Sequence, residues 1–477
     1  MNIKNLRKDV IGIDTEVTLL DGSRRRYVFL DNAASTPAFR SVLRSVEDLL
    51  QWYSGVHRGT GFKSQISTEL YDRAHAVVAK FVNADMDSNI VIFVKNSTEA
   101  INKLANRLDL NQEDIVITTL MEHHSNDLPW RKYCRVIHID VDDNGFLRLE
   151  DLKQVLKTQK GKVKLVAVSG ASNITGICNP IHDIAKWTHD AGAKIFVDAA
   201  QLAPHRPIDI LSNNDPSHID FLAFSAHKMY APFGTGVLVG PREIFEKGIP
   251  DVVGGGVVSA VSLEEVHWSS PPDKDEAGSP NVVGAVALAK SISLLEEVGM
   301  NKIAQHETKL LEYIYERMKK IPGVIHYGPT TNLERKVGVI SFNIKGMHNA
   351  LVASIMSAEG GIGLRNGCFC AHPYVKRLLN ISKEEDKIQT DRMIRGDRSD
   401  IPGLVRASFG CYNNEDDIDI FIEVLERIAN RKYKGTYIQN PKTGSFMEKN
   451  HIFQIPSCFN FLKLKYERDD SNLSEAS

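Results

Sequence analysis

The sequence predicts an α/β fold, in which a large domain with a mostly parallel sheet flanked by helices is followed by a smaller α+β C-terminal domain. Two observations favour this class. Between residues 27 and 298, short β-branched runs alternate with amphipathic segments of helix length, a pattern typical of parallel strands buried on both faces. The 477 residues are 42% hydrophobic and 25% charged, an ordinary composition and enough chain for two or more domains.

Eight runs are the predicted strands of the large domain. Segments of helix length separate most of them, so consecutive strands are expected to run parallel. The connection between the last two runs is too short for a helical crossover, and it predicts one antiparallel pair. In chain order the runs are YVFL, NIVIFV, DIVITT, RVIHID, KLVAVS, AKIFVD, DFLAFS and GVLVG.

Residues 287–321 carry apolar side chains at helical spacing and form either one long helix or two successive helices. The stretches GVISFNI, VRASFG and DIDIFIEVLERIANRKY then indicate the smaller domain. We predict an N-terminal arm (1–26), a large domain (27–298), a small C-terminal domain (299–435) and a C-terminal extension (436–477). The extension is irregular in sequence, and its last dozen residues are expected to be disordered.

Charge and cysteine content exclude several classes of function. The net charge of −2 gives the chain as a whole no electrostatic reason to bind nucleic acid or an anionic membrane, which favours a small-molecule substrate. There is no run of eighteen apolar residues and no apolar signal core, so a cytoplasmic location is expected. The six cysteines are too scattered for a disulfide scaffold, and reduced thiols are expected.

Polar side chains follow four of the predicted strands, at the edge where a doubly wound sheet places its ligand site. Lys228 follows FLAFS, Asp198 ends AKIFVD, and Asn173 lies in the turn after KLVAVS. Ser97 and Thr98 start the helix after NIVIFV, where free backbone N–H groups and the helix dipole can hold a phosphate.

Each of these residues has a plainer interpretation when it is taken alone. Lysines after strands commonly reach solvent, and Ser, Thr, Asp and Asn commonly cap helices or form turns. With Gln201, Ser225 and His227 nearby in sequence, however, the set combines an amine, a carboxylate, amides and a phosphate cradle. Together these groups satisfy one cofactor, pyridoxal phosphate.

Ten stretches carry a more specific signal. Their order is that of class V aminotransferase-fold enzymes, and they look like the cysteine desulfurase and selenocysteine lyase branch of that family. The resemblance runs from about Phe29 to Tyr412. The stretches are LDNAASTP, VHRG, NSTEAIN, MEHHSNDLPW, SNITG, VDAAQ, FSAHKMYAPFGTG, EAGSPN, RNGCFCAHP and VRASF.

The resemblance implies roles for the residues that face the cofactor ring. Lys228 would attach pyridoxal phosphate covalently, and Asp198 would pair with the protonated ring nitrogen. His123, the first histidine of the EHH motif, would stack on the ring. Asn173 and Gln201 would contact the ring hydroxyl, and Asn173 is also expected to bind the substrate.

The resemblance also implies how the phosphate is held. Thr98, Ser225 and His227 would bind it within the same chain, beside Ser97 at the helix start. Ser279, in EAGSPN, matches a position that reaches the phosphate of the neighbouring subunit. That match implies a homodimer with composite sites.

Two arginines and two cysteines complete the expected site. Arg406 and Arg365 are candidates for the substrate carboxylate, because a guanidinium offers a planar fork, although either could form a surface ion pair instead. The resemblance assigns the nucleophile to Cys370, directly before Ala371. Cys368 stands where many bacterial desulfurases have histidine, and GCFC looks like molybdenum-cofactor sulfurases. No metal site is expected, since C-x-C without a second ligand cluster is poor evidence for zinc.

The resemblance thus implies a cysteine desulfurase that converts L-cysteine to L-alanine, with a persulfide formed on Cys370 for a protein acceptor. The alternatives are an aminotransferase, an epimerase or a selenocysteine lyase on the same fold, and a sulfur-delivery scaffold without catalysis. Iron–sulfur cluster assembly, tRNA thiolation and a molybdenum cofactor all remain open as destinations of the sulfur.

Two local features add expectations. If C-F-C is extended, Cys368 and Cys370 share one face with Cα atoms about 6 to 7 Å apart, so an easy disulfide between them is not expected. The charged segment 380–403 extends the loop between Cys370 and Arg406. It is either a solvated excursion or a docking surface for a sulfur acceptor.

Overall fold

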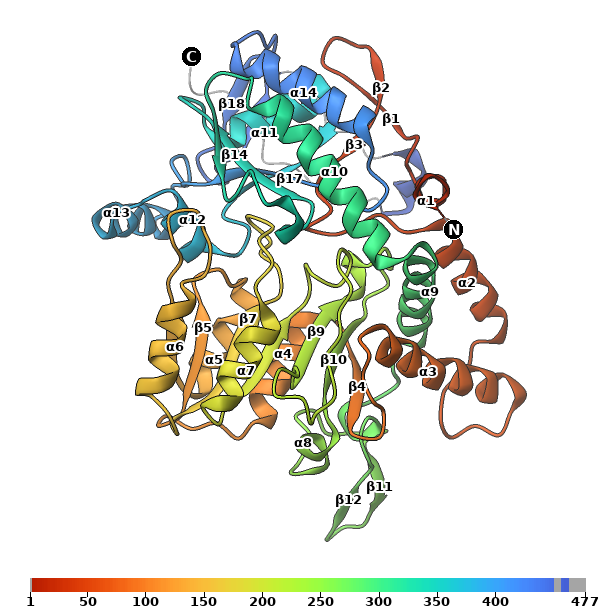
Figure 1. The fold of residues 1–477 in the computed structure, drawn as a ribbon. Coiled ribbons are helices and arrows are strands. Elements are labelled where there is room, and N and C mark those ends of the chain that lie inside the picture. Colours follow the sequence, from red (N-terminus) through yellow and green to blue (C-terminus); the bar gives the residue numbers. More distant parts are fainter. Residues whose placement is uncertain (1, 450–455, 463–477) are drawn as a thin grey trace.

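The computed structural model describes residues 2–449 and 456–462. Its large domain is built on a seven-stranded sheet of order β4-β10-β9-β8-β7-β5-β6 (Figure 1). The strands in chain order are β4 (Asn89–Val94), β5 (Ile115–Thr119), β6 (Arg135–Ile139), β7 (Val163–Ser169), β8 (Lys194–Asp198), β9 (Phe221–Ser225) and β10 (Gly236–Pro241).

Helices cover both faces of this sheet because successive residues of a buried strand point to opposite sides. Ile195 and Val197 of β8 face one core cluster, whereas Phe196 faces the other. The first cluster includes α2 (Arg40–Trp52), α3 (Phe62–Phe81), α6 (Leu149–Thr158), α7 (Ile181–Asp190) and α9 (Val282–Val298). The second includes α4 (Ser97–Arg107), α5 (Leu128–Tyr133) and α8 (Arg242–Glu246).

Two details of the predicted sheet are wrong. Strand β10 lies between β9 and β4 and is antiparallel to both, so the sheet has two antiparallel pairings where one was predicted. The YVFL run does not join this sheet, because β3 (Val28–Phe29) pairs in parallel with β15 (Ile362–Gly363). Val28 and Leu30 accordingly pack in the core of the smaller domain.

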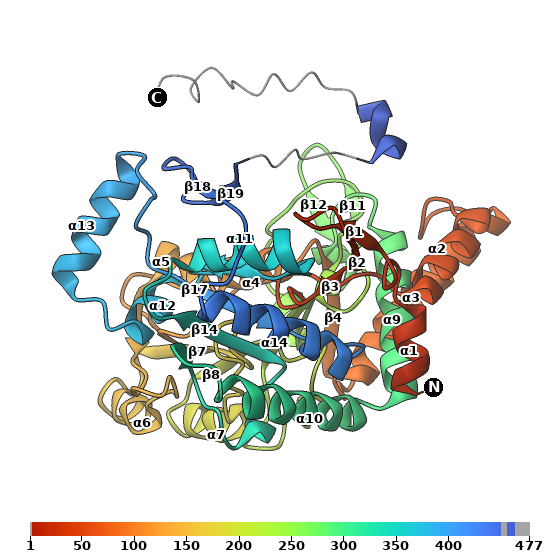
Figure 2. The same cartoon turned by 90° about the horizontal axis from the view of Figure 1, so that it is seen from above.

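The smaller domain has a four-stranded sheet of order β13-β14-β17-β16. Its helices α10, α11 and α14 lie together on one side of this sheet (Figures 1 and 2). Residues 287–321 form two helices, since Gly299, with φ of 96°, separates α9 from α10. The elements are α10 (Met300–Met318), β13 (Val324–Tyr327), β14 (Val339–Ile344), α11 (Asn349–Gly360), β16 (Arg365–Gly367), β17 (Leu404–Ser408) and α14 (Glu415–Ala429).

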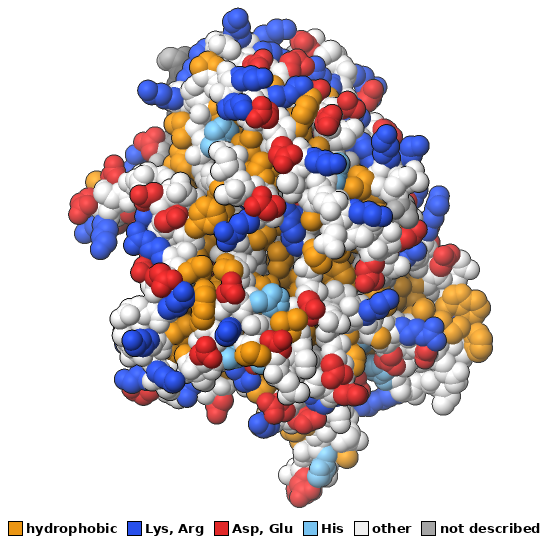
Figure 3. Space-filling view, in the orientation of Figure 1, with side chains coloured by type: hydrophobic (Ala, Val, Ile, Leu, Met, Phe, Trp, Pro, Cys, Tyr) orange, Lys and Arg blue, Asp and Glu red, His pale blue; other side chains and the backbone are white. Residues whose placement is uncertain are grey.

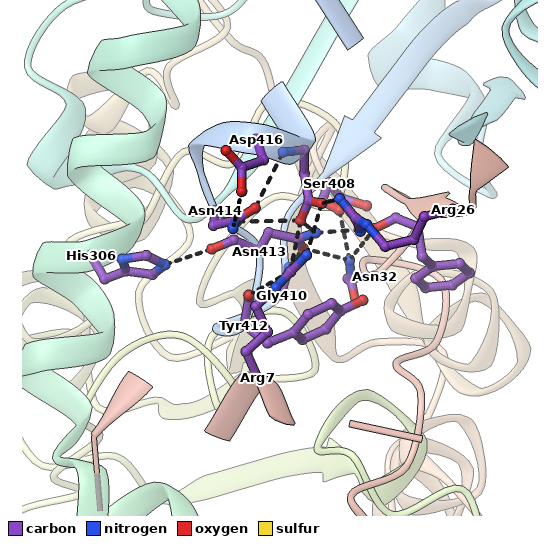
Figure 4. Close-up of polar contacts among 12 residues, drawn as sticks. Arg7, Arg26, Asn32, His306, Ser408, Gly410, Tyr412, Asn413, Asn414 and Asp416 are labelled. Atoms are coloured by element: carbon purple, nitrogen blue, oxygen red, sulfur yellow. Dashed lines mark hydrogen bonds and ion pairs between the residues drawn. The ribbon is translucent and has the colours of Figure 1, made fainter. Parts of the chain in front are cut away.

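The N-terminal arm is anchored to the smaller domain by polar contacts (Figure 4). It contains α1 (Ile3–Asp9), β1 (Glu16–Thr18) and β2 (Arg24–Arg26). Arg7 and Arg26 both form ion pairs with buried Asp417, at 2.9 and 2.8 Å. Asn32 donates to the Ser408 carbonyl at 2.9 Å and accepts from the Tyr412 hydroxyl at 3.0 Å. These contacts fix the chain on either side of Asn32, which leads into the candidate site.

Two additions lie beside each other outside the core (Figures 1 and 2). After α12 (His372–Leu378), the segment 380–403 forms α13 (Lys383–Ile394), in which no residue is buried. The extension is not wholly irregular as predicted, because β18 (Tyr437–Gln439) and β19 (Phe446–Glu448) form a hairpin. Gln439 donates to the Ser399 carbonyl at 2.7 Å and so connects the two additions. The last dozen residues lie outside the described residues.

A second hairpin, β11 (Val258–Val261) and β12 (Val266–Trp268), projects from the large domain (Figure 1). Within residues 2–449 and 456–462, no helix combines the length and apolar character needed to cross a membrane.

Candidate active site

A cavity of about 410 Å³ lies at the carboxyl ends of the parallel strands, between the two domains. It gathers every residue predicted for the site except Ser279. Those residues are Ser97, Thr98, His123, Asn173, Asp198, Gln201, Ser225, His227, Lys228, Arg365, Cys370 and Arg406.

Lys228 and Asp198 lie on neighbouring strand ends in this cavity. Lys228 follows β9 in a short 3-10 helix, and Asp198 is the last residue of β8, where its carboxylate accepts from the Ala200 N–H at 3.0 Å. Burial lowers the pKa of Lys228 to about 8, although the Asp198 charge opposes this shift. Burial likewise raises the pKa of Asp198. The site therefore contains an amine that loses its proton at about pH 8 and a carboxylate that lacks a direct cationic hydrogen-bond donor among the described residues.

The N-terminus of α4 faces the same cavity, with Asn96 as its cap. Ser225 accepts from the Ser97 N–H at 2.8 Å, and the two hydroxyls are 2.9 Å apart. The Thr98 hydroxyl lies 2.7 Å from that of Ser125. Hydroxyls, a helix dipole and the His227 ring thus surround a space that suits an anion.

His123 is held in one orientation by its neighbours. Its Nδ1 accepts from the Ser125 N–H at 3.2 Å, so the neutral ring carries its proton on Nε2. Burial and the charge of Lys228 lower the pKa of His123 to about 4. Glu122, the preceding residue, is buried and receives hydrogen bonds from Thr119, Ser169 and Asn126. Glu122 therefore ties the ends of β5 and β7 together beneath His123.

Two buried polar atoms in the cavity have no partner among the described residues. The Gln201 amide donates to the Ala33 carbonyl at 2.6 Å, which leaves its Oε1 unpaired. Arg406 donates to the Asn173 carbonyl and to Asp31, both at 3.0 Å, which leaves its Nε unpaired. Buried polar groups are normally hydrogen-bonded, so these atoms fit the ring hydroxyl of pyridoxal phosphate and a substrate carboxylate.

Asp31 links the two arginines on the wall of the site. Its carboxylate lies 2.9 Å from Arg365 Nε and 3.0 Å from an Arg406 nitrogen. Arg406 is almost completely buried and its guanidinium stacks on the Phe369 ring, whereas Arg365 is about half exposed. Burial lowers the pKa of Arg406 to about 10, so its charge persists at neutral pH.

The cysteine loop is not extended, so the prediction that Cys368 and Cys370 share one face is wrong. Phe369 and Cys370 are left-handed, with φ of 49° and 56°. This turn sends Cys370 to the exposed cavity wall and Cys368 into the protein, where its thiol donates to the Pro402 carbonyl at 3.0 Å. Burial raises the pKa of Cys368 to about 11. Among these two thiols, only that of Cys370 reaches the cavity.

Ser279 lies apart from the other predicted residues. It is exposed and lines a second cavity of about 300 Å³, with Lys95, which precedes α4, and Glu99 in the first turn of α4. Within one subunit, Ser279 does not line the cavity that holds Lys228.

Sequence reasoning missed several residues of this site. Asp31 and Glu122 were both inside motifs that carry the resemblance, LDNAASTP and MEHHSNDLPW, but their roles depend on partners distant in sequence. Ser125 follows the histidine pair and bonds both His123 and Thr98. A short polar residue two positions after His123 was the available signal for a ring-orienting contact.

Comparisons with known proteins identify the family of this chain. The model of the family described as aminotransferase class-V matches residues 28–421. A probable cysteine desulfurase from Halalkalibacterium halodurans is 34% identical over 436 residues, covering 90% of this chain and 98% of the relative. Another from Pyrococcus abyssi is 35% identical over 411 residues, covering 84% of this chain and 94% of the relative.

Solved structures give the same result. The apo cysteine desulfurase from Thermococcus onnurineus NA1 has a TM-score of 0.76 and 33% identity, covering 90% of this chain and 98% of its own. The S-sulfonic acid form of the cysteine desulfurase CsdA from Escherichia coli has a TM-score of 0.73 and 27% identity, covering 91% of this chain and all of its own.

Proposed function

The chain belongs to the class-V aminotransferase family, and from this premise we propose that it is a pyridoxal-phosphate-dependent cysteine desulfurase. It converts L-cysteine to L-alanine and takes the sulfur onto Cys370. The observation that carries this proposal is the presence of Cys370, Lys228 and Asp198 in one cavity. The cysteine desulfurases among its relatives support the assignment.

The residues that line the cavity suit pyridoxal phosphate. Lys228 would attach the cofactor, Asp198 would face its ring nitrogen, and His123 would lie on the ring face. Gln201 and Asn173 would meet the ring hydroxyl, with the unpaired Gln201 Oε1 as the acceptor. The serine, threonine and histidine side chains at the α4 end would hold the phosphate. When bound, the cofactor supplies an electron-withdrawing ring that makes the substrate Cα proton removable.

The chain's own groups then move the protons. The Lys228 amine takes the Cα proton, and its lowered pKa keeps much of it in the neutral form near pH 8. His123 stays neutral at this pH, and its Nε2 proton can be donated in the cavity. Asn173 cannot swing freely, because its amide nitrogen donates to the Phe369 carbonyl at 2.9 Å.

Cys370 transfers the sulfur as a nucleophile. Its thiolate attacks the substrate sulfur, so an S–S bond forms while the substrate C–S bond breaks. The electron pair of the broken bond stays with the carbon fragment, which takes up protons and leaves as alanine. The sulfur remains on Cys370 as a persulfide for an acceptor.

The two arginines give a graded prediction for substrate binding. We expect Arg406→Gln to raise the KM for L-cysteine roughly tenfold or more, because one charge-assisted hydrogen bond contributes about 1.5 to 3 kcal/mol. Arg365→Gln should have a smaller effect, since this side chain is half exposed. Steady-state kinetics check both variants. Arg392→Gln on α13, outside the cavity, is the control. A larger effect for Arg365 than for Arg406 would contradict the assignment.

Exposed apolar side chains support a homodimer in which Ser279 reaches the partner's phosphate. They gather near the end of α2, where Figure 3 shows an apolar patch, and on the β11–β12 hairpin. They are Leu50, Trp52, Tyr53, Phe62, Val261, Leu263 and Val266. Sedimentation should therefore give a dimer. The Ser279→Ala variant should bind the cofactor more weakly but remain a dimer. A monomer with full cofactor occupancy would rule out the composite site.

Product analysis tests the proposed function itself. Incubation with L-cysteine should yield alanine and, with a reductant, sulfide in equal amounts. A keto acid would instead indicate an aminotransferase, and absence of both products would favour the scaffold. Comparing L-cysteine with L-selenocysteine decides between the desulfurase and the selenocysteine lyase.

The protein that accepts the sulfur and the cytoplasmic location of the enzyme stay predictions. We propose a protein acceptor that docks beside the Cys370 loop. The segment that contains α13 contacts this loop through the Pro402 carbonyl and contacts the β18–β19 hairpin through the Ser399 carbonyl. Cytoplasmic location and a role in iron–sulfur cluster assembly are compatible with this proposal.

A further inference from the structure

A second cluster of polar side chains lies at the opposite edge of the large sheet. Asp220 directly precedes β9, whereas Lys228 follows its other end. His189 lies in the last turn of α7, and His218 lies in the loop before β9. Among the described residues, this is the one group of three His, Cys, Asp or Glu side chains whose ligand atoms all lie within 4.8 Å.

Both histidine rings face the same carboxylate. His189 Nε2 lies 2.8 Å from one oxygen of Asp220, and His218 Nε2 lies 3.6 Å from the other. The rings are stacked, with centroids 4.3 Å apart and an angle of 20° between their planes. The cluster lines a cavity of about 620 Å³, which leaves space beside the three ligand atoms.

The backbone fixes which nitrogen of each ring is free. His189 Nδ1 lies 2.8 Å from the Pro216 carbonyl, and His218 Nδ1 lies 2.6 Å from the Asp215 carbonyl. A carbonyl oxygen only accepts, so both Nδ1 atoms carry hydrogen. The Nε2 atom of each ring therefore faces Asp220 and is the atom left to bind a metal ion, which would displace the proton it carries. This arrangement, with a backbone carbonyl behind each ring, is typical of histidines that bind metals.

The charges around the cluster favour a cation. Asp220 supplies a buried carboxylate, which also accepts from the Ile195 N–H at 2.9 Å. The carboxylates of Asp87, Glu243 and Glu246 line the same cavity. Arg242 also lines it and adds one positive charge. Lys194 contacts Asp220 at 2.8 Å, but its side chain is 37% exposed and can turn to solvent when a cation arrives.

We propose that His189, His218 and Asp220 form a site for a divalent transition-metal ion, with Zn²⁺ as the best match. Two imidazole nitrogens and one carboxylate oxygen are a ligand set that zinc uses with a water in the fourth position. The cavity provides the place for that water. The ion would join α7 to the loop before β9, at the edge of the sheet remote from Lys228, and so stabilise the large domain.

Metal titration of the holoenzyme tests this site. The exposed thiols of Cys370 and Cys458 are first alkylated, so that they do not bind the ion. Calorimetry with Zn²⁺ should show one ion per chain, and Co²⁺ should give the visible bands of a tetrahedral site. His189→Ala and His218→Ala should each lose at least about 100-fold in affinity, since even outer-shell partners contribute 10- to 100-fold. Zn²⁺ should also raise the unfolding temperature of the wild type and not of these variants.

His182→Ala is the matched control. His182 also contacts this loop, with its Nδ1 3.0 Å from the Ser217 carbonyl, but it does not belong to the ligand cluster. This variant should bind Zn²⁺ like the wild type. If the alanine variants do not fold, His189→Gln and His218→Gln retain a donor for the backbone carbonyls. Absence of uptake by the wild type, or equal affinity in the ligand variants, would overturn the proposal.

Discussion

Lys228→Ala should abolish turnover of L-cysteine. Burial lowers the pKa of the Lys228 amine to about 8, which suits it to act as the general base. Removing a general base costs about 100- to 10,000-fold in rate. Loss of the covalent attachment adds to that cost. Borohydride reduction followed by peptide mapping should find the cofactor on Lys228 in the wild type and on no lysine in the variant.

The fold should survive this change. Burial disfavours the charged form of Lys228, so alanine removes a desolvated amine and leaves the neighbouring strands β8 and β10 in place. Lys95→Ala is a suitable control, because Lys95 is exposed and lies outside the cavity that holds Lys228. Reduction that fixes the cofactor to another lysine would show the assignment to be wrong.

Cys370→Ser should nearly eliminate desulfuration while leaving the cofactor spectrum and substrate binding intact. Only Cys370 of the C-F-C pair reaches the cavity, and a hydroxyl in its place does not accept sulfur. We expect a loss of at least about 100-fold, as for removal of other catalytic groups. Alanine formation measures the rate, and the change in the cofactor spectrum on adding L-cysteine measures binding.

Cys368→Ser is the matched variant and should retain most of the activity. The serine hydroxyl can replace the buried thiol as the donor to the Pro402 carbonyl. Because burial raises the pKa of Cys368 to about 11, little of it is thiolate at neutral pH. If Cys368→Ser were inactive and Cys370→Ser active, the nucleophile would be the buried cysteine.

Much of the large sheet could be predicted from sequence because its strands are local apolar runs, such as FLAFS and KIFVD. The place of β10 could not be predicted in this way. Its pairing with β4 joins residues far apart in sequence, as in Gly236 opposite Val94, and no local pattern encodes that contact. The prediction that the YVFL run joins the large sheet was wrong for a related reason. Its Val28 pairs with Ile362, which lies in the smaller domain.

Part of the site could be predicted because polar residues such as Asp198 and Lys228 lie at strand ends, whereas His123 and Cys370 were implied by the family resemblance. Asp31 is different, because its role depends on arginines 334 and 375 residues away. The cysteine loop was mispredicted because left-handed backbone at two successive non-glycine residues is rare. Here Asn173 binds the Phe369 carbonyl and the His124 N–H donates to the Cys370 carbonyl at 2.7 Å. These contacts come from other loops, and together they hold the turn that exposes Cys370.

Mass spectrometry of the enzyme after a single addition of L-cysteine, without an acceptor or a reductant, shows whether Cys370 takes the substrate sulfur. We expect one extra sulfur atom on the peptide that contains Cys370, located on Cys370 by fragmentation, together with one alanine per active site. Extra sulfur on Cys368, or alanine released without any sulfur bound to the protein, would contradict it.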